Sequence, residues 1–266
     1  MAPTYRLRPG TFSDIPAVSN LYVQGFDKEP LLDYMFPGRR VNRAPFDTWI
    51  LRRFRLRYWT SGYFLTMVFA CDEDEDGIDG DDDAEEKGEI EKSRQRQEKG
   101  RPVGFTWWHR PAESLPVRER WLSPYAWFRP VISTILTLHS RLFPISSIDP
   151  YPLGIYDRVF AKIEPEILNS SRRRAAWYLA TVAVDPAVQG HGVGAMLVRD
   201  GLRKADHEDV ATWLVGLRGL ERFYSRFGFL EVGRANVDSA ACVAYADDQK
   251  HNLGKNQAVT RCPRFK

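Results

Sequence analysis

The order of apolar and polar positions predicts a chain in which strands and helices follow one another. Short apolar or alternating runs are typical of strands, and apolar residues every three or four positions are typical of helices. We expect strands at 4–8, 63–70, 102–109, 176–184, 211–216, 229–234 and 240–246, and helices at 13–25, 43–59, 192–207 and 219–227. In the first part of the chain few of the predicted strands are separated by helices, whereas in the last part several are. This order predicts one α/β (α+β) domain over 1–266, a strongly twisted mixed sheet flanked by helices.

The most informative segment is an apolar strand that runs into a glycine-rich turn. Trp177–Val184 has one polar residue, as expected of a strand covered on both faces, and Asp185-Pro186 ends it. Gly190, Gly192 and Gly194 follow, and helical periodicity begins inside the glycine run. The first amides of a helix have no partner within the helix and carry partial positive charge. A phosphate group would therefore be held at this turn by the backbone.

Three other interpretations of the turn are weaker. No Gly-Lys-Ser/Thr follows the glycines, which disfavours a nucleoside-triphosphate loop. Gly190-x-Gly192-x-x-Ala195 matches the dinucleotide fingerprint, but the acid expected after the next strand is missing. The third alternative is a connection without a ligand, although three alternating glycines lose backbone entropy that an ordinary loop keeps. A phosphorylated cofactor remains the favoured inference.

Three segments carry a resemblance to a known family. Gln189-x-x-Gly192-x-Gly194, after a strand, resembles motif A of the GCN5-related N-acetyltransferase (GNAT) superfamily, and 220–229 resembles its motif B. Residues 5–15 are similar to the first strand and helix start of that superfamily. The matches lie toward the two ends of the chain and leave 110–175 unexplained.

The resemblance implies an acyl-CoA-dependent N-acyltransferase that uses acetyl-CoA or another acyl-CoA. It implies that main-chain groups of one strand segment hold the pantetheine arm and that turn amides hold the pyrophosphate. The strand residues are Val182, Ala183 and Val184, and the turn residues are Gln189, Gly190, His191, Gly192, Val193, Gly194 and Ala195. Tyr224 occupies the place of the tyrosine that protonates the departing thiolate. A core aromatic residue is the alternative for Tyr224.

The chain departs from the family pattern at two positions. Many relatives carry an asparagine just after the fifth strand, where this chain reads Gly216-Leu217-Arg218-Gly219. Several relatives carry a glutamate base on the fourth strand, and 177–184 contains no carboxylate. His109, at the end of the third strand, is a candidate base because histidine titrates near neutral pH. A surface histidine is the alternative, with Glu113, Asp157 or a water chain as other routes for the proton.

The acceptor side is expected in a long helical insertion between the third and fourth strands. This insertion, at 110–175, is expected to cap the acceptor site. We predict that Trp107, Trp121 and Trp127 bind a hydrophobic or aromatic acceptor. The alternative is that these aromatic residues form the insertion's own core.

An acidic segment separates the second and third strands. Residues 72–86 hold eleven acids and no base, so a disordered loop is predicted at 72–100. Without these acids the formal charge changes from +3 to +14, which suits anionic CoA. The basic run from Arg52 to Arg57 raises nucleic acid as a partner. We disfavour it, because charged helix residues usually mark a solvated face and no nucleic-acid motif is present.

Composition bounds the remaining possibilities. The chain has 266 residues and 43% hydrophobic content. Its three cysteines show no paired spacing, which indicates neither a disulfide framework nor a metal site. We expect a cytoplasmic protein without a membrane partner, since no signal peptide or apolar run of spanning length is present, and we expect no nucleic-acid partner. The oligomeric state stays open.

The simplest prediction is acetyl transfer from acetyl-CoA to a primary amine of a small molecule by direct attack. The alternatives are a silent CoA-binding sensor or scaffold, a protein amine as acceptor, and different chemistry on the same scaffold.

Overall fold

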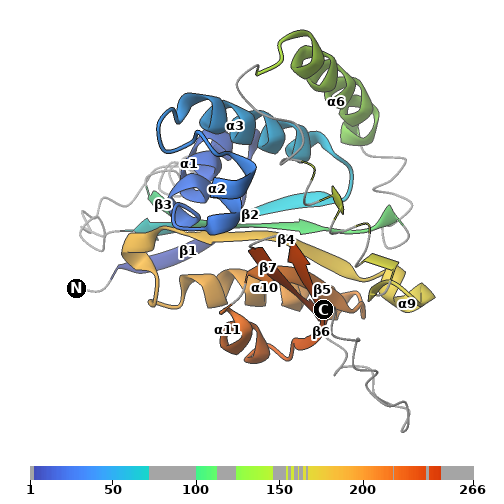
Figure 1. Ribbon diagram of the computed structural model, residues 1–266. Coiled ribbons are helices and arrows are strands. Elements are labelled where there is room, and N and C mark those ends of the chain that lie inside the picture. Colours follow the sequence, from blue (N-terminus) through green and yellow to red (C-terminus); the bar gives the residue numbers. More distant parts are fainter. Residues whose placement is uncertain are drawn as a thin grey trace, which may run out of the picture.

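One mixed sheet organises the protein. The computed structural model describes residues 3–71, 100–112, 124–145, 154, 157–158, 161, 164–165, 167–217, 219–237 and 240–246. Within these residues seven strands form one sheet in the order β1-β2-β3-β4-β5-β7-β6 (Figure 1). The strands are β1 (Thr4–Pro9), β2 (Tyr63–Cys71), β3 (Arg101–His109), β4 (Trp177–Val184), β5 (Thr212–Leu217), β6 (Leu230–Val237) and β7 (Ala240–Ala246). Strand β7 matches its predicted range, and the first five strands match theirs within one residue at each end.

The sheet is mixed, as the sequence predicts. Strands β1 to β4 pair antiparallel in chain order, and β5, β7 and β6 also pair antiparallel. Between these two parts, β4 pairs with β5 in parallel. Parallel neighbours need a crossover connection, which helix α10 (Val193–His207) supplies. The single parallel contact therefore lies in the middle of the sheet, directly before the glycine turn.

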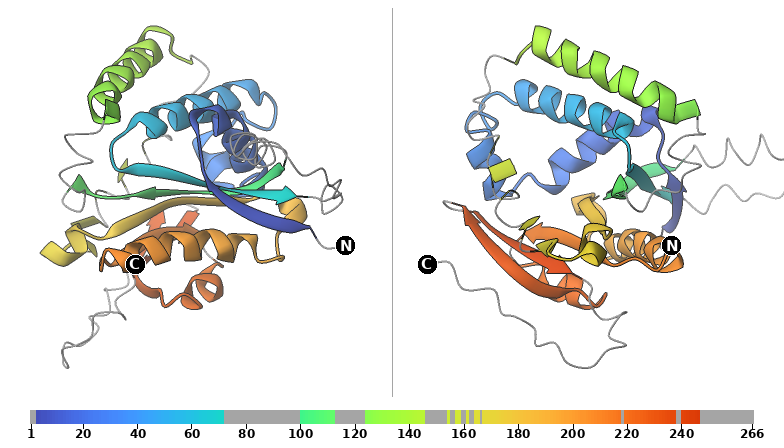
Figure 2. Two further views of the ribbon diagram at one scale, coloured as in Figure 1. Left: turned by 180° about the vertical axis from the view of Figure 1, so that it is seen from behind. Right: turned by 90° about the vertical axis from the view of Figure 1, so that its right-hand side faces the viewer.

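Helices cover both faces of the sheet. On one face lie α1 (Ile15–Gly25), α2 (Pro30–Met35) and α3 (Ala44–Trp59), and on the other lie α10 and α11 (Glu221–Ser225) (Figures 1 and 2). The side chains divide accordingly. Phe105 and Trp107 of β3 join the core under α1–α3, whereas Trp108 joins the core under α10. Helix α3 contributes Phe46, Ile50 and Phe54, which recur every four residues and are almost fully buried.

Between β3 and β4 the described residues include α6 (Pro124–Leu142) and α9 (Ser171–Arg174). Helix α6 lies against the outer side of α3, away from the sheet (Figures 1 and 2). Helix α2 has no counterpart among the predicted elements. The acidic segment at 72–99 lies outside the described residues. In the part of the chain that is described, no helix has the length and apolar character needed to cross a membrane.

Candidate active site

Strands β4 and β5 part after a short paired segment. They pair at Trp177–Thr212, Tyr178–Trp213 and Leu179–Leu214, and over the described residues the ladder ends there. Opposite this point the β3–β4 register shifts, which leaves Ala180 as an extra residue in β4, a β-bulge. A bulge bends its strand and interrupts the ladder. Backbone groups of β4 beyond Leu179 therefore face a gap where an extended ligand can pair with them.

The glycine turn follows the end of β4 and begins helix α10. Gly190 has φ +86° and Gly192 has φ +85°, a region that side chains other than glycine rarely adopt. A Cβ atom added at either glycine would meet nothing within 4 Å, so the backbone is open on this side. The amides of Gly192 through Ala195 donate to no carbonyl of a described residue. The turn thus presents several free N–H groups at the positive end of a helix.

Side-chain contacts hold the turn against β4. Asp185 caps the short 3₁₀ helix Pro186–Val188 by accepting from the Ala187 amide at 2.9 Å. The Gln189 amide group donates to the Val184 carbonyl at 3.1 Å, which ties the turn back to the strand end. These bonds explain why the sequence folds into a fixed turn here despite its glycines.

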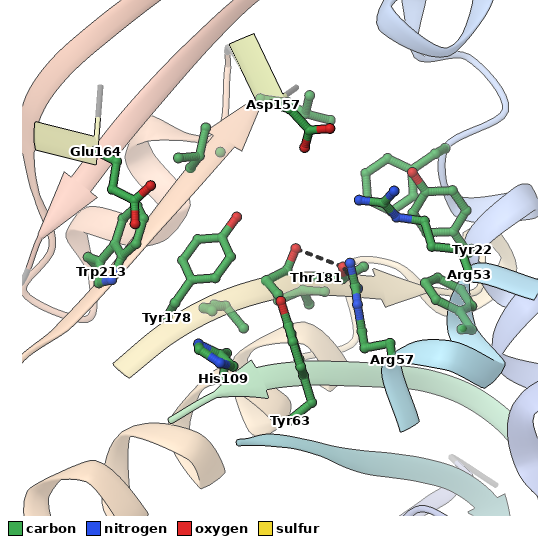
Figure 3. A pocket seen from close by; sticks show the side chains of 18 of the residues that line it. Tyr22, Arg53, Arg57, Tyr63, His109, Asp157, Glu164, Tyr178, Thr181 and Trp213 are labelled. Carbon is green, nitrogen blue, oxygen red and sulfur yellow. Dashed lines mark hydrogen bonds between the residues drawn. The ribbon is translucent and has the colours of Figure 1, made fainter. Parts of the chain in front are cut away.

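A cavity of about 610 Å³ lies between the α1–α3 layer and the sheet and reaches the gap between β4 and β5 (Figure 3). Its wall is assembled from elements that are far apart in the sequence. The lining includes Tyr22 of α1, Arg53 and Arg57 of α3, Tyr63 of β2, His109 of β3, Tyr178, Thr181 and Val182 of β4, Trp213 and Leu217 of β5, and Tyr224 of α11.

A row of four rings crosses the sheet along the cavity. Tyr63, His109, Tyr178 and Trp213 occupy directly paired positions on β2, β3, β4 and β5. The Tyr63 and His109 ring centroids are 4.5 Å apart, and those of Tyr178 and Trp213 are 4.4 Å apart. Cross-strand pairs of this kind stabilise a sheet. They also fix the His109 imidazole in the cavity wall.

His109 is positioned by its own neighbours and has an altered titration. The backbone at Gly62 has φ +82°, and a Cβ there would lie 2.2 Å from the Arg110 carbonyl oxygen and 3.1 Å from the His109 ring. Only glycine permits this approach. Burial, followed by the positive charge of Arg57, lowers the pKa of His109 below its usual value of 6.5. The imidazole is therefore neutral at pH 7, the form that can accept a proton, and no described residue hydrogen-bonds its ring nitrogens.

Tyr224 lies at the end of the cavity formed by the strand gap. Its side chain is 6% exposed and packs with Phe223 and Phe229, at ring distances of 5.0 and 6.0 Å. It also lines the cavity together with Leu217. The two interpretations of Tyr224 are thus compatible, because a core contact on one side of the ring leaves the other side facing the cavity.

Two of the three tryptophans predicted to bind the acceptor lie away from the cavity. Trp107 is fully buried and is not among the residues that line the cavity, because it packs under Arg57 and Tyr63. Trp127 is 71% exposed on α6, which packs on α3 and not on the cavity. Trp121 lies outside the described residues. The described residues of 110–175 that do line the cavity are Pro111, Asp157, Glu164, Leu168 and Arg174.

The sequence analysis missed two arginines of the cavity wall. Arg53 and Arg57 belong to the basic run that we assigned to a solvated face, yet both line the cavity. The helical spacing held a usable signal. Trp49, Arg53 and Arg57 are four residues apart, and this row lies beside the buried row of Phe46, Ile50 and Phe54. A row of charged residues beside the buried face of a helix can line a cavity as well as face solvent.

The comparisons with known proteins agree with this geometry. The model of the acetyltransferase (GNAT) family matches residues 157–229. Among solved structures, the chain is similar to a Corynebacterium glutamicum ATCC 13032 protein described as histone acetyltransferase HPA2 and related acetyltransferase. The identity is 19% and the TM-score 0.54, over 93% of this chain and 96% of that chain. It is also similar to the C-terminal condensation domain of Ebony in complex with beta-alanyl-dopamine, at 9% identity and TM-score 0.54, over 92% and 99% of the two chains. No curated protein sequence matches the chain.

The sheet that opens between two parallel strands and the glycine turn at the start of α10 belong to the fold that the chain shares with these solved proteins. Residues 157–229, which include β4, the glycine turn, α10, β5 and α11, thus match the acetyltransferase (GNAT) family, whose members use acetyl-CoA.

Proposed function

We propose that the protein transfers the acetyl group of acetyl-CoA to a primary amine of a small molecule by direct attack. The observation that carries this proposal is the continuity of the cavity. It runs from Leu217 and Tyr224, at the gap between β4 and β5, to Tyr22 and Arg53 under the helical layer. An acceptor in the cavity could therefore meet a thioester in the gap, with both reactants held for an intramolecular-like reaction.

On the donor side, backbone groups do the binding. Val182, Ala183 and Val184 lie in the segment of β4 that has left β5, so their main-chain groups are free on that side to pair with the amides of pantetheine. The amides from Gln189 through Ala195 would hold the pyrophosphate, since those of Gly192 through Ala195 are free N–H donors at the positive end of the helix dipole. No lysine or metal ion is needed at this turn.

On the acceptor side, the reaction needs one group that accepts a proton and one that donates a proton. The amine nitrogen forms a bond to the acetyl carbon, the carbon–sulfur bond breaks, and an amide and CoA result. His109 would take the proton that the amine loses, and Tyr224 would give its phenolic proton to the thiolate sulfur. A positioned acid or base contributes a factor of about 10²–10⁴ in rate. His109 would thereby replace the carboxylate that β4 lacks.

The test is a binding and turnover experiment on the full chain. Calorimetry with acetyl-CoA measures donor binding, and thiol release measured across a panel of amines, with mass spectrometry of the product, measures transfer. We expect binding and an N-acetylated amine. Binding with no thiol release for any amine would favour a CoA sensor, and thiol release with a protein substrate alone would move the acceptor to a protein amine. Absence of acetyl-CoA binding would overturn the proposal.

A further inference from the structure

Two arginines of α3 point into the acceptor cavity. Arg53 and Arg57 are one helical turn apart, and Figure 3 shows both guanidinium groups directed toward the open space. Arg57 Nη1 donates to Thr181 Oγ1 at 2.9 Å, and its guanidinium lies over the rings of Tyr63 and Phe54 at 5.2 and 5.5 Å. Packing on three sides fixes Arg57, while the rest of its donors remain for a ligand.

Neither guanidinium forms an ion pair with a carboxylate of the described residues. Arg39 shows the contrast, because this buried arginine contacts Asp33 at 2.7 Å and Asp27 at 3.5 Å. Arg53 is exposed at the edge of the cavity, whereas the guanidinium of half-buried Arg57 is packed among aromatic rings. A desolvated charge without a partner, as at Arg57, is unfavourable, and aromatic faces compensate only in part. Burial lowers the pKa of Arg57, and the like charge of Arg53 acts in the same direction. This wall of the cavity is therefore built for an anion that the described chain does not supply.

The pyrophosphate of CoA is not that anion. None of the residues from Gln189 to Ala195 lines this cavity, so the glycine turn and the arginine pair are separate sites. The arginines belong to the acceptor side. Thr181, which accepts from Arg57, directly follows the bulge residue Ala180, where the gap opens. An anion on Arg57 would thus lie beside the point at which donor and acceptor meet.

The facing part of the wall carries the opposite charge. Asp157 and Glu164 line the cavity across from the arginines (Figure 3), and neither has an ion pair with Arg53 or Arg57. Arg174 also lines the cavity, so the wall carries both cationic and anionic groups. A ligand with both charges, such as an amino acid with its ammonium and carboxylate groups, complements this arrangement better than a simple amine or a polyamine.

We propose that the acceptor is a compact amine that also carries an anionic group, as an amino acid does, and that Arg53 and Arg57 bind this group. The inference rests on the proposed acetyl transfer and adds the class of acceptor to it. Arginine binds carboxylate or phosphate through paired hydrogen bonds, so the site selects the anion by geometry as well as charge. The amine would then be directed toward the gap, His109 and Tyr224.

The test compares amines that differ only in the anionic group. Wild-type protein is assayed with acetyl-CoA and three pairs of amines, the anionic member first in each pair. The pairs are L-tyrosine and tyramine, L-lysine and cadaverine, and phosphoethanolamine and ethanolamine. We expect at least one anionic member to exceed its neutral counterpart in kcat/KM by about 10-fold or more. Arg57→Gln and Arg53→Gln should each lower kcat/KM for that member by about 10–100-fold and change the neutral member less than about twofold. Arg55→Gln, an exposed arginine of the same helix outside the cavity, is the matched control and should change neither.

Other outcomes separate this inference from the proposed function. Equal use of neutral and anionic amines, or equal loss for both in Arg57→Gln, would overturn the arginine assignment while leaving acetyl transfer intact. A preference for succinyl-CoA over acetyl-CoA with tyramine, lost in Arg57→Gln, would assign the anion to the acyl group and overturn the acceptor assignment. Calorimetry adds a readout without turnover. Wild-type protein saturated with CoA should bind the acetylated form of the preferred anionic amine. The Arg57→Gln variant should bind it weakly or not at all. Equal affinity of the wild-type protein for the acetylated neutral counterpart would contradict the proposal.

Discussion

The donor side and the acceptor side of the proposed site are built by different means. The proposed donor side is a continuous segment, from Val182 to Ala195, and it presents backbone groups. The proposed acceptor cavity takes side chains from helices and strands between Tyr22 and Tyr224. A backbone site is specified by local sequence, because glycines and a strand end determine which amides are free. A side-chain site is specified by packing, so its chemistry emerges only when distant elements are brought together.

The two sides should therefore respond differently to substitution. On the donor side, shortening a side chain removes little, and a substitution acts when it obstructs the backbone or adds repulsive charge. On the acceptor side, each functional group is itself a side chain, and its removal deletes one step of binding or catalysis. Substitutions on the two sides should separate acetyl-CoA affinity from turnover.

The largest effect is expected at Gly192. Gly192→Asp places a carboxylate where the pyrophosphate would lie, at a position with φ +85°. We expect acetyl-CoA affinity to fall by about 100-fold or more, because like charge replaces a favourable helix N-terminus. Calorimetry of the acetyl-CoA complex measures this loss.

Two variants control for the Gly192 substitution. Gly192→Asn has the same size and backbone demand without the charge, and should lose clearly less affinity. Gly38→Asp adds the same side chain where nothing lies within 4 Å of a new Cβ, outside both sites, and should bind normally. Full affinity in Gly192→Asp would remove the turn from the donor site.

The next effect is expected at Tyr224. Tyr224→Phe keeps the ring contacts with Phe223 and Phe229 and removes the proton donor. We expect kcat to fall by about 10²-fold with acetyl-CoA affinity within about twofold of wild type. Steady-state kinetics and calorimetry together measure the separation. Tyr34→Phe, the same change outside the cavity lining, is the control, and a wild-type kcat in Tyr224→Phe would exclude Tyr224 as the acid.

A smaller effect with a pH signature is expected at His109. Its pKa is below 6.5, so the neutral base persists through pH 7 and kcat/KM should fall only as pH falls through that lowered value. His109→Gln should lower the plateau by about 10-fold and remove this acidic limb. The stability effect has the same direction. Because the unfolded state binds this proton more readily, the contribution of His109 is present above pH 6.5 and is lost as pH falls toward its folded pKa.

The origin of the lowered His109 pKa can be tested separately. Arg57→Gln removes a nearby positive charge, so the His109 pKa should rise and the acidic limb should move to higher pH. The titration of the His109 ring, followed by NMR and assigned with His109→Gln, measures this shift without turnover. His139→Gln, on exposed α6, should leave the limb in place. An acidic limb that survives in His109→Gln would assign the base to another group.

The sequence predicted the elements that form the proposed donor side far better than the packing that forms the cavity, because the former depend on local pattern. The bounds of β4 and α10, and the glycines between them, follow from local pattern and were predicted within one residue. The parting of β4 from β5 was not predicted, since it depends on how two strands that are distant in the sequence diverge after three paired residues. Helix α2 was missed because it has only six residues, too few for a helical period to be recognised.

The cavity shows where local pattern stops being informative. A charged row on a helix looks the same whether solvent or a cavity lies beside it, so the orientation of Arg53 and Arg57 required the packing of α3 on the sheet. Aromatic residues are equally ambiguous. Trp213 lines the cavity from a strand on which the sequence analysis placed no acceptor residue, while Trp107 is fully buried and does not line the cavity.

The smallest effect is expected at Trp127, where sequence and structure disagree most directly. The aromatic content of the insertion predicts acceptor binding, but Trp127 is 71% exposed on α6, and α6 packs on the outer side of α3. Trp127→Ala should therefore change the acceptor KM by less than about twofold, since its side chain contacts neither the cavity nor the strand gap. Trp49→Ala is the matched comparison, because Trp49 lines the cavity and lies 5.0 Å under the Arg53 guanidinium. Losing that ring should raise the acceptor KM several-fold, about 3–10-fold, by freeing Arg53. If Trp127→Ala raised KM as much as Trp49→Ala, the outer face of α6 would belong to the acceptor side, and the division between a local donor site and a packed acceptor cavity would have to be redrawn.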